Sequence, residues 1–336
     1  MPSKPRFSGR RSRWYAARMV AEVGETDIPR ADALVGQGSE PVPEGCYLCG
    51  GRELFLRFAP RGDTNGPGAE AYRCTSFGHG SHPPIWKCRS CGMVSQWPIR
   101  HETELLDEYR LVEDPIYEAE RESRYFTFRH VLRSVGPGEG RTLLDVGAYC
   151  GYFLDVAREG GFRPEGLELS KWAAERARSL GFAVHGEPLA ERAASGASYD
   201  TITMWDVIEH MADPRAELES AFELLRPGGT LHLSTVDVGS LVARAMGPRW
   251  PWLMDMHLHY FDRSTISRLL REVGFVDVTV GHYRHYVSVG YLSDKMETIA
   301  GRAAPAVRRA GRIVPRHWRL PVTLGDNMLV RSTRPL

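Results

Sequence analysis

Long apolar runs and an excess of either charge are both missing from this sequence of 336 residues. No apolar stretch approaches 18 residues, which excludes a membrane-spanning helix. With 43 basic and 42 acidic side chains the formal net charge is +1, so nucleic acid is not an expected partner. An apolar fraction of 42% is ample for one large core. We therefore expect a globular, cytoplasmic protein.

Acidic residues are also missing from the start of the chain, where several arginines occur and Glu22 is the first acid. A secretion signal would need an apolar stretch after the arginines, and Trp14–Met19 is too short and too charged to supply one. We expect residues 1–44 to form a disordered basic leader. Weak contact with an anionic surface is the alternative.

A dinucleotide-binding fingerprint, with glycines at its first, third and sixth positions, is absent too. The chain has instead the stretch Leu143–Phe153, an apolar run that ends in Asp145, passes Gly147 and Gly151, and continues into a helical pattern. This order predicts a strand, a tight turn and a helix. A nucleotide-like cofactor can lie there against bare backbone and a helix N-terminus, although a βα turn without a ligand is the plain alternative.

The segment Pro164–Ser170 predicts a second short strand that ends in an acid, Glu168, 23 residues after Asp145. An acid at this place can accept hydrogen bonds from both hydroxyls of a ribose. Ser170 is expected to cap a helix over residues 171–179. Further strands are expected at residues 183–185, 199–205, 230–235 and 276–280. Strands and helices alternate throughout, which predicts an α/β fold with a mainly parallel sheet covered on both faces.

The D-x-G-x-x-x-G pattern from Asp145 to Gly151 resembles the first motif of class I S-adenosylmethionine (SAM)-dependent methyltransferases, with Tyr149 in place of the middle glycine. The segments Asp206–His210 and Leu224–Gly229 resemble the same family, over roughly residues 125–290. The resemblance implies a Rossmann-like, seven-stranded sheet, SAM as cofactor and a transferase activity. It places these residues at the cofactor: Asp145, Gly147, Tyr149, Gly151, Glu168, Glu187, Trp205 and Asp206.

Four of the six cysteines form two C-x-x-C pairs, Cys46 with Cys49 and Cys88 with Cys91, and a glycine follows each pair. Two such pairs predict a tetrahedral structural zinc site in a zinc ribbon. The glycines can take the left-handed conformation that the turns need. Disulfides are the alternative, but nothing in the sequence indicates an oxidising compartment.

Between the pairs, residues 60–84 are rich in Gly, Pro and His and predict a loop inserted in the ribbon. Cys74, His79 and His82 lie in this loop and are expected to be solvated, with a role as spare ligands as the alternative. A ribbon before such a domain resembles bacterial methyltransferases acting on sugars, glycans and specialised metabolites, which implies a small, sugar-containing acceptor. We expect the zinc to organise a lid or substrate platform, because four thiolates close its coordination sphere.

Three candidate catalytic side chains follow the strand 199–205: Asp206, Glu209 and His210. If a helix begins there, the three share one face. His210 is the first candidate for a general base, because imidazole titrates near neutral pH. Two alternatives remain: the trio holds a divalent metal, as similar stretches do in quinone O-methyltransferases, or Glu209 and His210 only cap the helix.

The connection between Val236 and Ser264 is long and carries a second group of histidines and aromatics. Long connections at a cleft edge often carry function. His257 and His259 alternate, so both should face one way in an extended segment, and His259 is the second candidate for the base. The tryptophans of this connection are expected either to stack on an acceptor or to belong to the core.

The expected organisation is a leader (1–44), a zinc ribbon (45–100), a helical linker (101–140), the SAM-binding domain (141–290) and a C-terminal cover (291–336). The cover should contain a basic helix over 296–316, for which an anionic lipid or substrate is the alternative role, and a final antiparallel edge strand at Met328–Arg331. The expected activity is O-methylation of a sugar, glycoside or other small metabolite. The alternatives are C-methylation of a nucleotide-linked keto-sugar and a non-catalytic zinc-ribbon adaptor.

Overall fold

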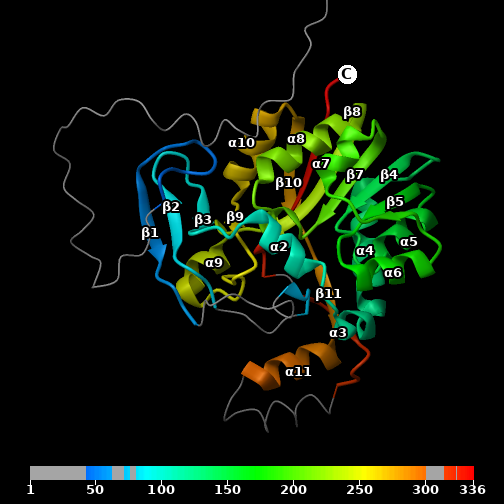
Figure 1. Ribbon diagram of the computed structural model, residues 1–336. Coiled ribbons are helices and arrows are strands. Elements are labelled where there is room, and N and C mark those ends of the chain that lie inside the picture. Colours follow the sequence, from blue (N-terminus) through cyan, green and yellow to red (C-terminus); the bar gives the residue numbers. More distant parts are fainter. Residues whose placement is uncertain (1–42, 63–71, 76–80, 300–313, 323) are drawn as a thin grey trace, which may run out of the picture. The chain divides into compact units, whose positions relative to one another are not determined.

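The computed structural model describes residues 43–62, 72–75, 81–299, 314–322 and 324–336. All of them belong to one compact unit, Val42–Leu336 (Figure 1). The expected leader lies outside the described residues except for its last two positions, and His79 lies outside them too. No helix in the described ranges is both long and apolar enough to cross a bilayer.

A seven-stranded sheet in the order β10-β13-β8-β7-β4-β5-β6 forms the centre of this unit. The pairs among β8, β7, β4, β5 and β6 are parallel, whereas β13 is antiparallel to both of its neighbours. The strands are β4 (Thr142–Val146), β5 (Arg163–Leu167), β6 (Val184–His185), β7 (Tyr199–Trp205), β8 (Leu225–Val236), β10 (Val276–His282) and β13 (Asn327–Thr333). The predicted mainly parallel α/β sheet is confirmed.

The last strand, β13, departs from the expectation of an edge strand. It lies between β10 and β8, and β10 forms the edge instead. Met328 and Val330 of β13 are 0% and 1% exposed. Strand β13 is antiparallel as expected, but its apolar side chains are buried in the interior of the sheet.

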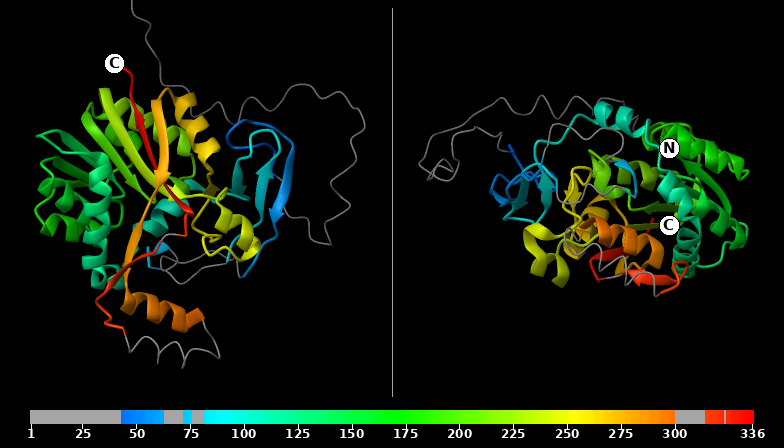
Figure 2. Two further views of the ribbon diagram at one scale, coloured as in Figure 1. Left: turned by 180° about the vertical axis from the view of Figure 1, so that it is seen from behind. Right: turned by 90° about the horizontal axis from the view of Figure 1, so that it is seen from below.

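Helices cover both faces of the sheet (Figures 1 and 2). One core joins the sheet to α7 (Leu189–Ala194), α8 (Pro214–Leu224) and α10 (Arg263–Val273). A second core includes residues of α4 (Arg121–Val135), α5 (Tyr152–Glu159) and α6 (Lys171–Ser179). Two shorter helices, α2 (Glu102–Tyr109) and α3 (Pro115–Ala119), precede α4 in the expected helical linker.

Short polar side chains set the starts of these helices. The Ser170 hydroxyl accepts the amide of Ala173 at the start of α6, as predicted. Asp262 forms a capping box with Thr265 at the start of α10, and Gly274 ends that helix in the left-handed region.

The N-terminal ribbon forms its own sheet in the order β1-β2-β3-β9. Strands β1 (Leu54–Phe58), β2 (Ile85–Cys88) and β3 (Val94–Gln96) make the antiparallel ribbon. The fourth strand, β9 (His259–Tyr260), comes from the long connection after β8. The ribbon sheet is therefore completed by the part of the chain that carries the second histidine group, which the sequence did not reveal.

Strands β11 (His285–Ser288) and β12 (Arg319–Val322) form a separate two-stranded antiparallel sheet, and both come between β10 and β13 in the chain. Between these strands lies α11 (Val289–Ile299), which begins before the expected basic helix; most of that helix (300–313) falls outside the described residues. Strand β11 packs on α4, where the Thr127 hydroxyl accepts the Tyr286 amide at 3.0 Å.

Candidate functional site

Two glycines shape the loop that joins β4 to α5. Gly147 and Gly151 both have positive φ, 72° and 78°. A Cβ on Gly147 would lie 2.7 Å from Cγ2 of Val207, and a Cβ on Gly151 would lie 2.8 Å from Cβ of Ala177. A larger residue at either place would meet both backbone strain and a collision. The loop therefore presents bare backbone at the start of α5, which suits a nucleotide-like ligand.

Tyr149 stands where the resembling family has its middle glycine, and it takes a glycine-like φ of 46°. Such a backbone costs a non-glycine residue of order 1–3 kcal/mol. Its ring packs edge-on against Tyr117, with the centroids 4.5 Å apart. The Tyr149 hydroxyl is buried and has no hydrogen-bond partner among the described residues. Tyr149 therefore keeps the glycine-like backbone of the loop and adds a buried hydroxyl with which a ligand can form a hydrogen bond.

Glu168 ties the loop to the end of β5. Its Oε2 accepts the Tyr149 amide at 2.8 Å, and its Oε1 accepts the Ser170 amide at 2.7 Å. Burial raises the pKa of Glu168 to about 7, although both amides act in the opposite direction. Each carboxylate oxygen keeps a second lone pair, so the side chain can also accept ribose hydroxyls.

Asp145, the acid at the end of β4, is 1% exposed. Its Oδ1 accepts a hydrogen bond from the Thr203 hydroxyl at 2.5 Å, and burial raises its pKa to about 8. This buried side chain joins β4 to β7 through its hydrogen bond with Thr203. Its predicted contact with the cofactor stays a prediction.

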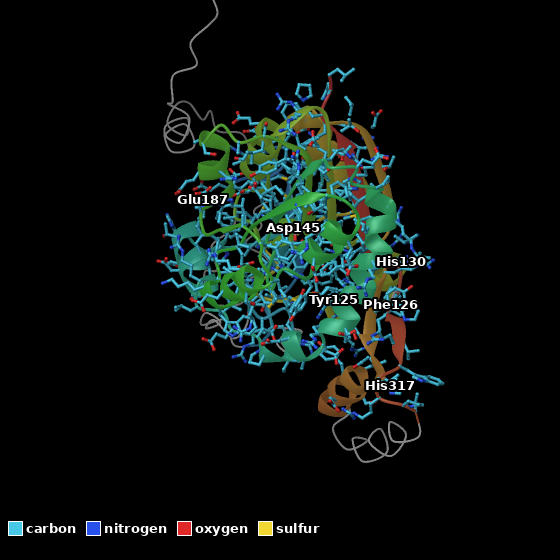
Figure 3. All side chains as sticks on the ribbon, turned by 90° about the vertical axis from the view of Figure 1, so that its right-hand side faces the viewer. Tyr125, Phe126, His130, Asp145, Glu187 and His317 are labelled. Atoms are coloured by element: carbon cyan, nitrogen blue, oxygen red, sulfur yellow. The ribbon has the colours of Figure 1, made fainter. Side chains whose placement is uncertain are left out.

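Trp205, the last residue of β7, packs edge-on against Phe153 of α5, with centroids 4.9 Å apart. Its indole Nε1 is buried and has no partner among the described residues. Glu187 lies apart from Asp145 in Figure 3, and its Oε1 is 3.6 Å from the Arg192 guanidinium. The cofactor contacts expected of Trp205 and Glu187 stay predictions.

Asp206 follows β7 and has an unusual positive φ of 55°. Its Oδ1 accepts the Ser234 hydroxyl at 2.7 Å, and its Oδ2 lies 3.3 Å from Nε2 of His285 on β11. Burial would raise the pKa of Asp206, but His285 and Ser234 hold it below its usual value. An ionised carboxylate therefore faces an imidazole at the carboxyl end of β7.

In the structure, the ligand group around Glu209 and His210 contains His257 and not Asp206. Residues Ile208–His210 form a single 3-10 turn, so the helical face that would have aligned the trio does not exist. The ligand atoms of Glu209, His210 and His257 lie within 4.8 Å of one another instead. His257 takes the third place in this group, Asp206 acts electrostatically on both Glu209 and His210, and the role expected of the trio stays a prediction.

Backbone carbonyls orient both imidazoles of this Glu209–His210–His257 cluster. Nδ1 of His210 lies 2.7 Å from the Met256 carbonyl, and Nδ1 of His257 lies 2.9 Å from the Trp252 carbonyl. Each Nδ1 must donate there, so each Nε2 carries a lone pair. Burial raises the pKa of Glu209 to about 8 and lowers that of His210. The cluster can accept a proton or a cation.

His259, the second predicted base, is 0% exposed. Its Nδ1 lies 3.0 Å from the Ser95 hydroxyl, and its Nε2 lies 3.4 Å from the Ala212 carbonyl. Burial lowers its pKa to about 4. The His257 ring packs against His210, whereas His259 contacts Ser95. The two alternating histidines therefore contact different parts of the fold. Both ring nitrogens of His259 are engaged within the fold, which fits a structural role better than proton transfer.

Sequence reasoning missed two side chains of this region, His285 and Arg124. The Arg124 guanidinium on α4 lies over the Tyr117 ring, 4.6 Å from its centroid, and acts electrostatically on Asp206. No carboxylate of the described residues lies within ion-pair distance of it. Neither residue belongs to a recognisable motif, so only the fold could reveal them.

The four predicted zinc ligands come together. Sγ of Cys46 lies 3.5 Å from Sγ of Cys91, and Sγ of Cys49 lies 3.6 Å from Sγ of Cys88. Zn–S bonds of about 2.3 Å in a tetrahedron place the sulfurs about 3.8 Å apart. Cys74 and His82 are not part of this cluster. The donor set and the spacing fit one Zn²⁺.

The first cysteine pair also contacts the methyltransferase-like part of the chain. The Tyr47 hydroxyl donates to the Asp213 carboxylate and accepts the Arg215 amide at 2.7 Å. The Tyr47 ring packs on His259, with the centroids 4.5 Å apart. Cys46 and Cys88 belong to the same apolar core as α8 and α10. The cysteine cluster is thus continuous with the core beside the main sheet.

Comparison with known proteins finds methyltransferases that are similar to part of this chain. Residues 117–280 match a protein family described as a methyltransferase domain. The ubiquinone biosynthesis O-methyltransferase of Paracidovorax citrulli is 33% identical over 116 residues, which cover 32% of this chain and 48% of that protein. The enzyme of the same name from Cronobacter sakazakii is 27% identical over 171 residues, which cover 48% of this chain and 70% of that protein. The chain spans about half the length of the first curated relatives that it matches.

Among solved structures, a SAM-dependent methyltransferase from Archaeoglobus fulgidus is similar with a TM-score of 0.45 and 16% identity, covering 63% of this chain and 94% of that one. The family match spans the glycine loop, Glu168, Asp206 and the main-sheet strands from β4 to β7. Residues 117–280 of this chain therefore match a methyltransferase domain.

Proposed function

We propose that this protein transfers a methyl group from SAM to a hydroxyl oxygen of a small metabolite. The observation that carries the proposal is the Glu168 carboxylate, which holds the glycine loop by two backbone amides and keeps lone pairs for ribose hydroxyls. The buried Tyr149 hydroxyl and Trp205 indole, both without partners among the described residues, are further groups that a bound cofactor can satisfy.

Arg124 is the group that we assign to the carboxylate of the cofactor's methionine part. It is the charged residue of α4 that acts on Asp206, and no described carboxylate pairs with it. A desolvated guanidinium without an anion is costly, and a bidentate carboxylate satisfies it well. Glu168 and Arg124 would then hold the two polar ends of SAM and direct its methyl group between them.

Two features favour oxygen as the acceptor atom. The similar curated proteins are named O-methyltransferases, and the described site offers two imidazoles, His210 beside the buried Glu209 carboxylate and His285 beside the partly exposed Asp206 carboxylate. A hydroxyl must lose its proton as it attacks, which is work for an imidazole base. We keep a sugar-containing acceptor as the proposed class, and C-methylation of a nucleotide-linked keto-sugar as the alternative.

We also propose that Cys46, Cys49, Cys88 and Cys91 bind one structural Zn²⁺. The sulfur spacing supports this, and so do Gly50 and Gly92, whose φ of 68° and 81° are the left-handed values that the two turns need. A closed set of four thiolates leaves no position for a substrate, so this metal would cross-link the ribbon rather than take part in methyl transfer.

The Glu209–His210–His257 cluster supports a second, smaller proposal, a divalent cation beside the acceptor. Two imidazoles and a carboxylate, with tautomers set by backbone carbonyls, are a donor set used for such ions. If the cation is absent, His210 remains a candidate for the base.

The function is tested by incubating the protein with SAM and two hydroxyl probes, 3,4-dihydroxybenzoate and methyl α-D-mannopyranoside. Mass spectrometry should find a product heavier by one methyl group and an equal amount of S-adenosylhomocysteine. Calorimetric titration with SAM separates an enzyme from an adaptor, since a protein without a cofactor site would give no binding heat. A methyl group that NMR places on carbon would overturn the assignment to oxygen.

A further inference from the structure

The assignments above give the pair formed by Asp206 and His285 no defined step in the reaction. Asp206 directly follows β7, whereas His285 begins β11, about 80 residues later in the chain. Their side chains meet with Oδ2 of Asp206 3.3 Å from Nε2 of His285. Asp206 reaches this position through a positive φ of 55°, a strained backbone of the kind that functional sites often contain.

The carboxylate of this pair is held firmly. The Ser234 hydroxyl donates to Oδ1 of Asp206 at 2.7 Å and also accepts the Asp206 amide at 3.0 Å. The remaining oxygen, Oδ2, is the one that faces His285. An ionised carboxylate fixed beside one imidazole nitrogen selects the tautomer with hydrogen on that nitrogen and stabilises the imidazolium that forms when the ring takes a second proton.

The other nitrogen of His285, Nδ1, makes no hydrogen bond to any part of the chain that the structure describes. Its side chain is 18% exposed, so the ring is half-buried rather than sealed. The other histidines near the strand ends are engaged differently. Nδ1 of His210 and of His257 donates to backbone carbonyls, and both nitrogens of His259 are engaged within the fold.

A series of ring contacts joins His285 to the cofactor loop. His285 lies edge-on to Tyr283 with centroids 4.4 Å apart, Tyr283 stacks on Trp205 at 6.3 Å, and Trp205 packs on Phe153 at 4.9 Å. Phe153 is the second residue of α5, directly after the loop. The pair therefore lies on the side of the loop where β7 ends, the side at which ligands bind in open α/β sheets.

We propose that His285 is the catalytic base that removes the acceptor's proton, and that Asp206 is its positioning residue. The proposal rests on the proposed function. In the transfer step the acceptor's O–H bond breaks and its proton passes to Nδ1 of His285. The oxygen forms a bond to the methyl carbon while the bond from that carbon to sulfur breaks, and the electron pair stays on sulfur. Neutral S-adenosylhomocysteine, a methyl ether and an imidazolium result, and the imidazolium later returns its proton to solvent.

The kinetic test compares His285→Asn with the wild type and with a matched control, His282→Asn, which removes an exposed histidine three residues earlier. His285→Asn should bind SAM within about threefold of wild type and lower kcat roughly 100-fold, with KM little changed. The loss should be larger for methyl α-D-mannopyranoside than for 3,4-dihydroxybenzoate, since a less acidic hydroxyl depends more on a base. His285→Ala should regain activity with added imidazole.

Asp206→Asn tests the positioning role. It should lower kcat less than His285→Asn does, and it should displace the pH profile of kcat. The control His282→Asn should keep the wild-type pH profile. The charged and titratable groups around the pair include Arg124 on α4, Tyr283 beside β11, and Glu209 and His210 after β7, and all four are kept in these variants.

Nitrogen-15 NMR of the wild type bound to S-adenosylhomocysteine gives a readout without any acceptor. At pH 8 the His285 signals should show hydrogen on Nε2 and none on Nδ1, and Asp206→Asn should alter this tautomer. If the wild type methylates neither probe but shows this tautomer, the proposed function fails while the pair stands. If His285→Asn binds SAM and turns over at the wild-type rate, or if His285 carries its hydrogen on Nδ1, the inference is overturned.

Discussion

Ser95 and His259 face each other twice, as backbone partners of β3 and β9 and through a 3.0 Å contact between the serine hydroxyl and Nδ1 of the imidazole. Ser95 belongs to the ribbon, and His259 follows the segment that carries His257. The amide of Leu258, between the two histidines, donates to the Glu209 carbonyl at 2.9 Å. The cysteine cluster is thus linked by a short series of contacts to the Glu209–His210–His257 cluster.

Loss of the ribbon metal should therefore have two effects. The wild type should contain close to one zinc per chain. Cys46→Ser should lose this zinc and have a lower melting temperature, because structural zinc binding is coupled to folding. It should also lower turnover, since strand β9, which begins two residues after His257, loses its support. Elemental analysis, thermal unfolding and the methyl-transfer assay measure the three quantities.

The control for this prediction is Cys74→Ser, which changes a cysteine outside the cluster. It should keep full zinc and the wild-type melting temperature. Zinc that persists after replacement of all four clustered cysteines would contradict the assignment.

Glu168→Ala should weaken SAM binding by the value of one or two charge-assisted hydrogen bonds, about 1.5–3 kcal/mol each. It also removes the acceptor of two backbone amides, so the variant should be less stable even without SAM. Calorimetry gives the first effect and thermal unfolding the second. An unchanged dissociation constant would rule out the ribose contact.

SAM affinity should depend on pH through the same carboxyl group. Burial raises the pKa of Glu168 to about 7, above its ordinary value, so the cofactor-free protein keeps the proton until the pH rises through about 7. Only the carboxylate can accept both ribose hydroxyls, so affinity should increase from pH 6 to pH 8 and then level off. This pH dependence of SAM affinity should disappear in Glu168→Gln. If the affinity of that variant changes with pH as much as that of the wild type, a group other than Glu168 takes up the proton.

Gly147→Ala should impair SAM binding and lower stability together, because its Cβ would lie 2.7 Å from Val207 in a left-handed backbone. Gly140→Ala is the matched control. Gly140 has a similar φ of 81°, but a Cβ there would meet no atom within 4 Å. The control should lose some stability, of order 1 kcal/mol, and keep SAM affinity. Equal SAM affinities in the two variants would contradict the role of the loop.

The divalent-cation proposal predicts that Mn²⁺ binds the zinc-replete protein at one site, seen by electron paramagnetic resonance. His257→Ala and His210→Ala should each weaken that binding, whereas His285→Asn should not. If the two cluster variants bind Mn²⁺ as the wild type does, the Glu209–His210–His257 cluster holds no cation and His210 returns as a candidate for proton transfer.

Features encoded in short stretches could be predicted from the sequence. The strand Tyr199–Trp205, the Ser170 cap and the cysteine pairs all follow from neighbouring residues, since apolar runs, cap residues and metal knuckles act over a few positions. The loop glycines were recognisable for the same reason.

Features that depend on pairing between distant segments could not be predicted. Strand β9 is two residues long and joins the ribbon only because β3 lies beside it. His285 reaches Asp206 because the chain returns to α4 after β10, and His257 replaces Asp206 in the cluster because the 3-10 turn ends the expected helical face. Periodicity in a sequence carries no information about such contacts.

The position of β13 has a consequence for how the protein is made. Strand β13 inserts between β8 and β10, although both precede it in the chain. On the ribosome, the other six strands of the sheet emerge before residues 327–333. Until then β8 and β10 each present an unpaired edge, a surface on which strands of other chains can pair. The nascent chain is therefore most exposed to aggregation just before synthesis delivers β13, and slowing elongation after β10 should lower the yield of folded protein.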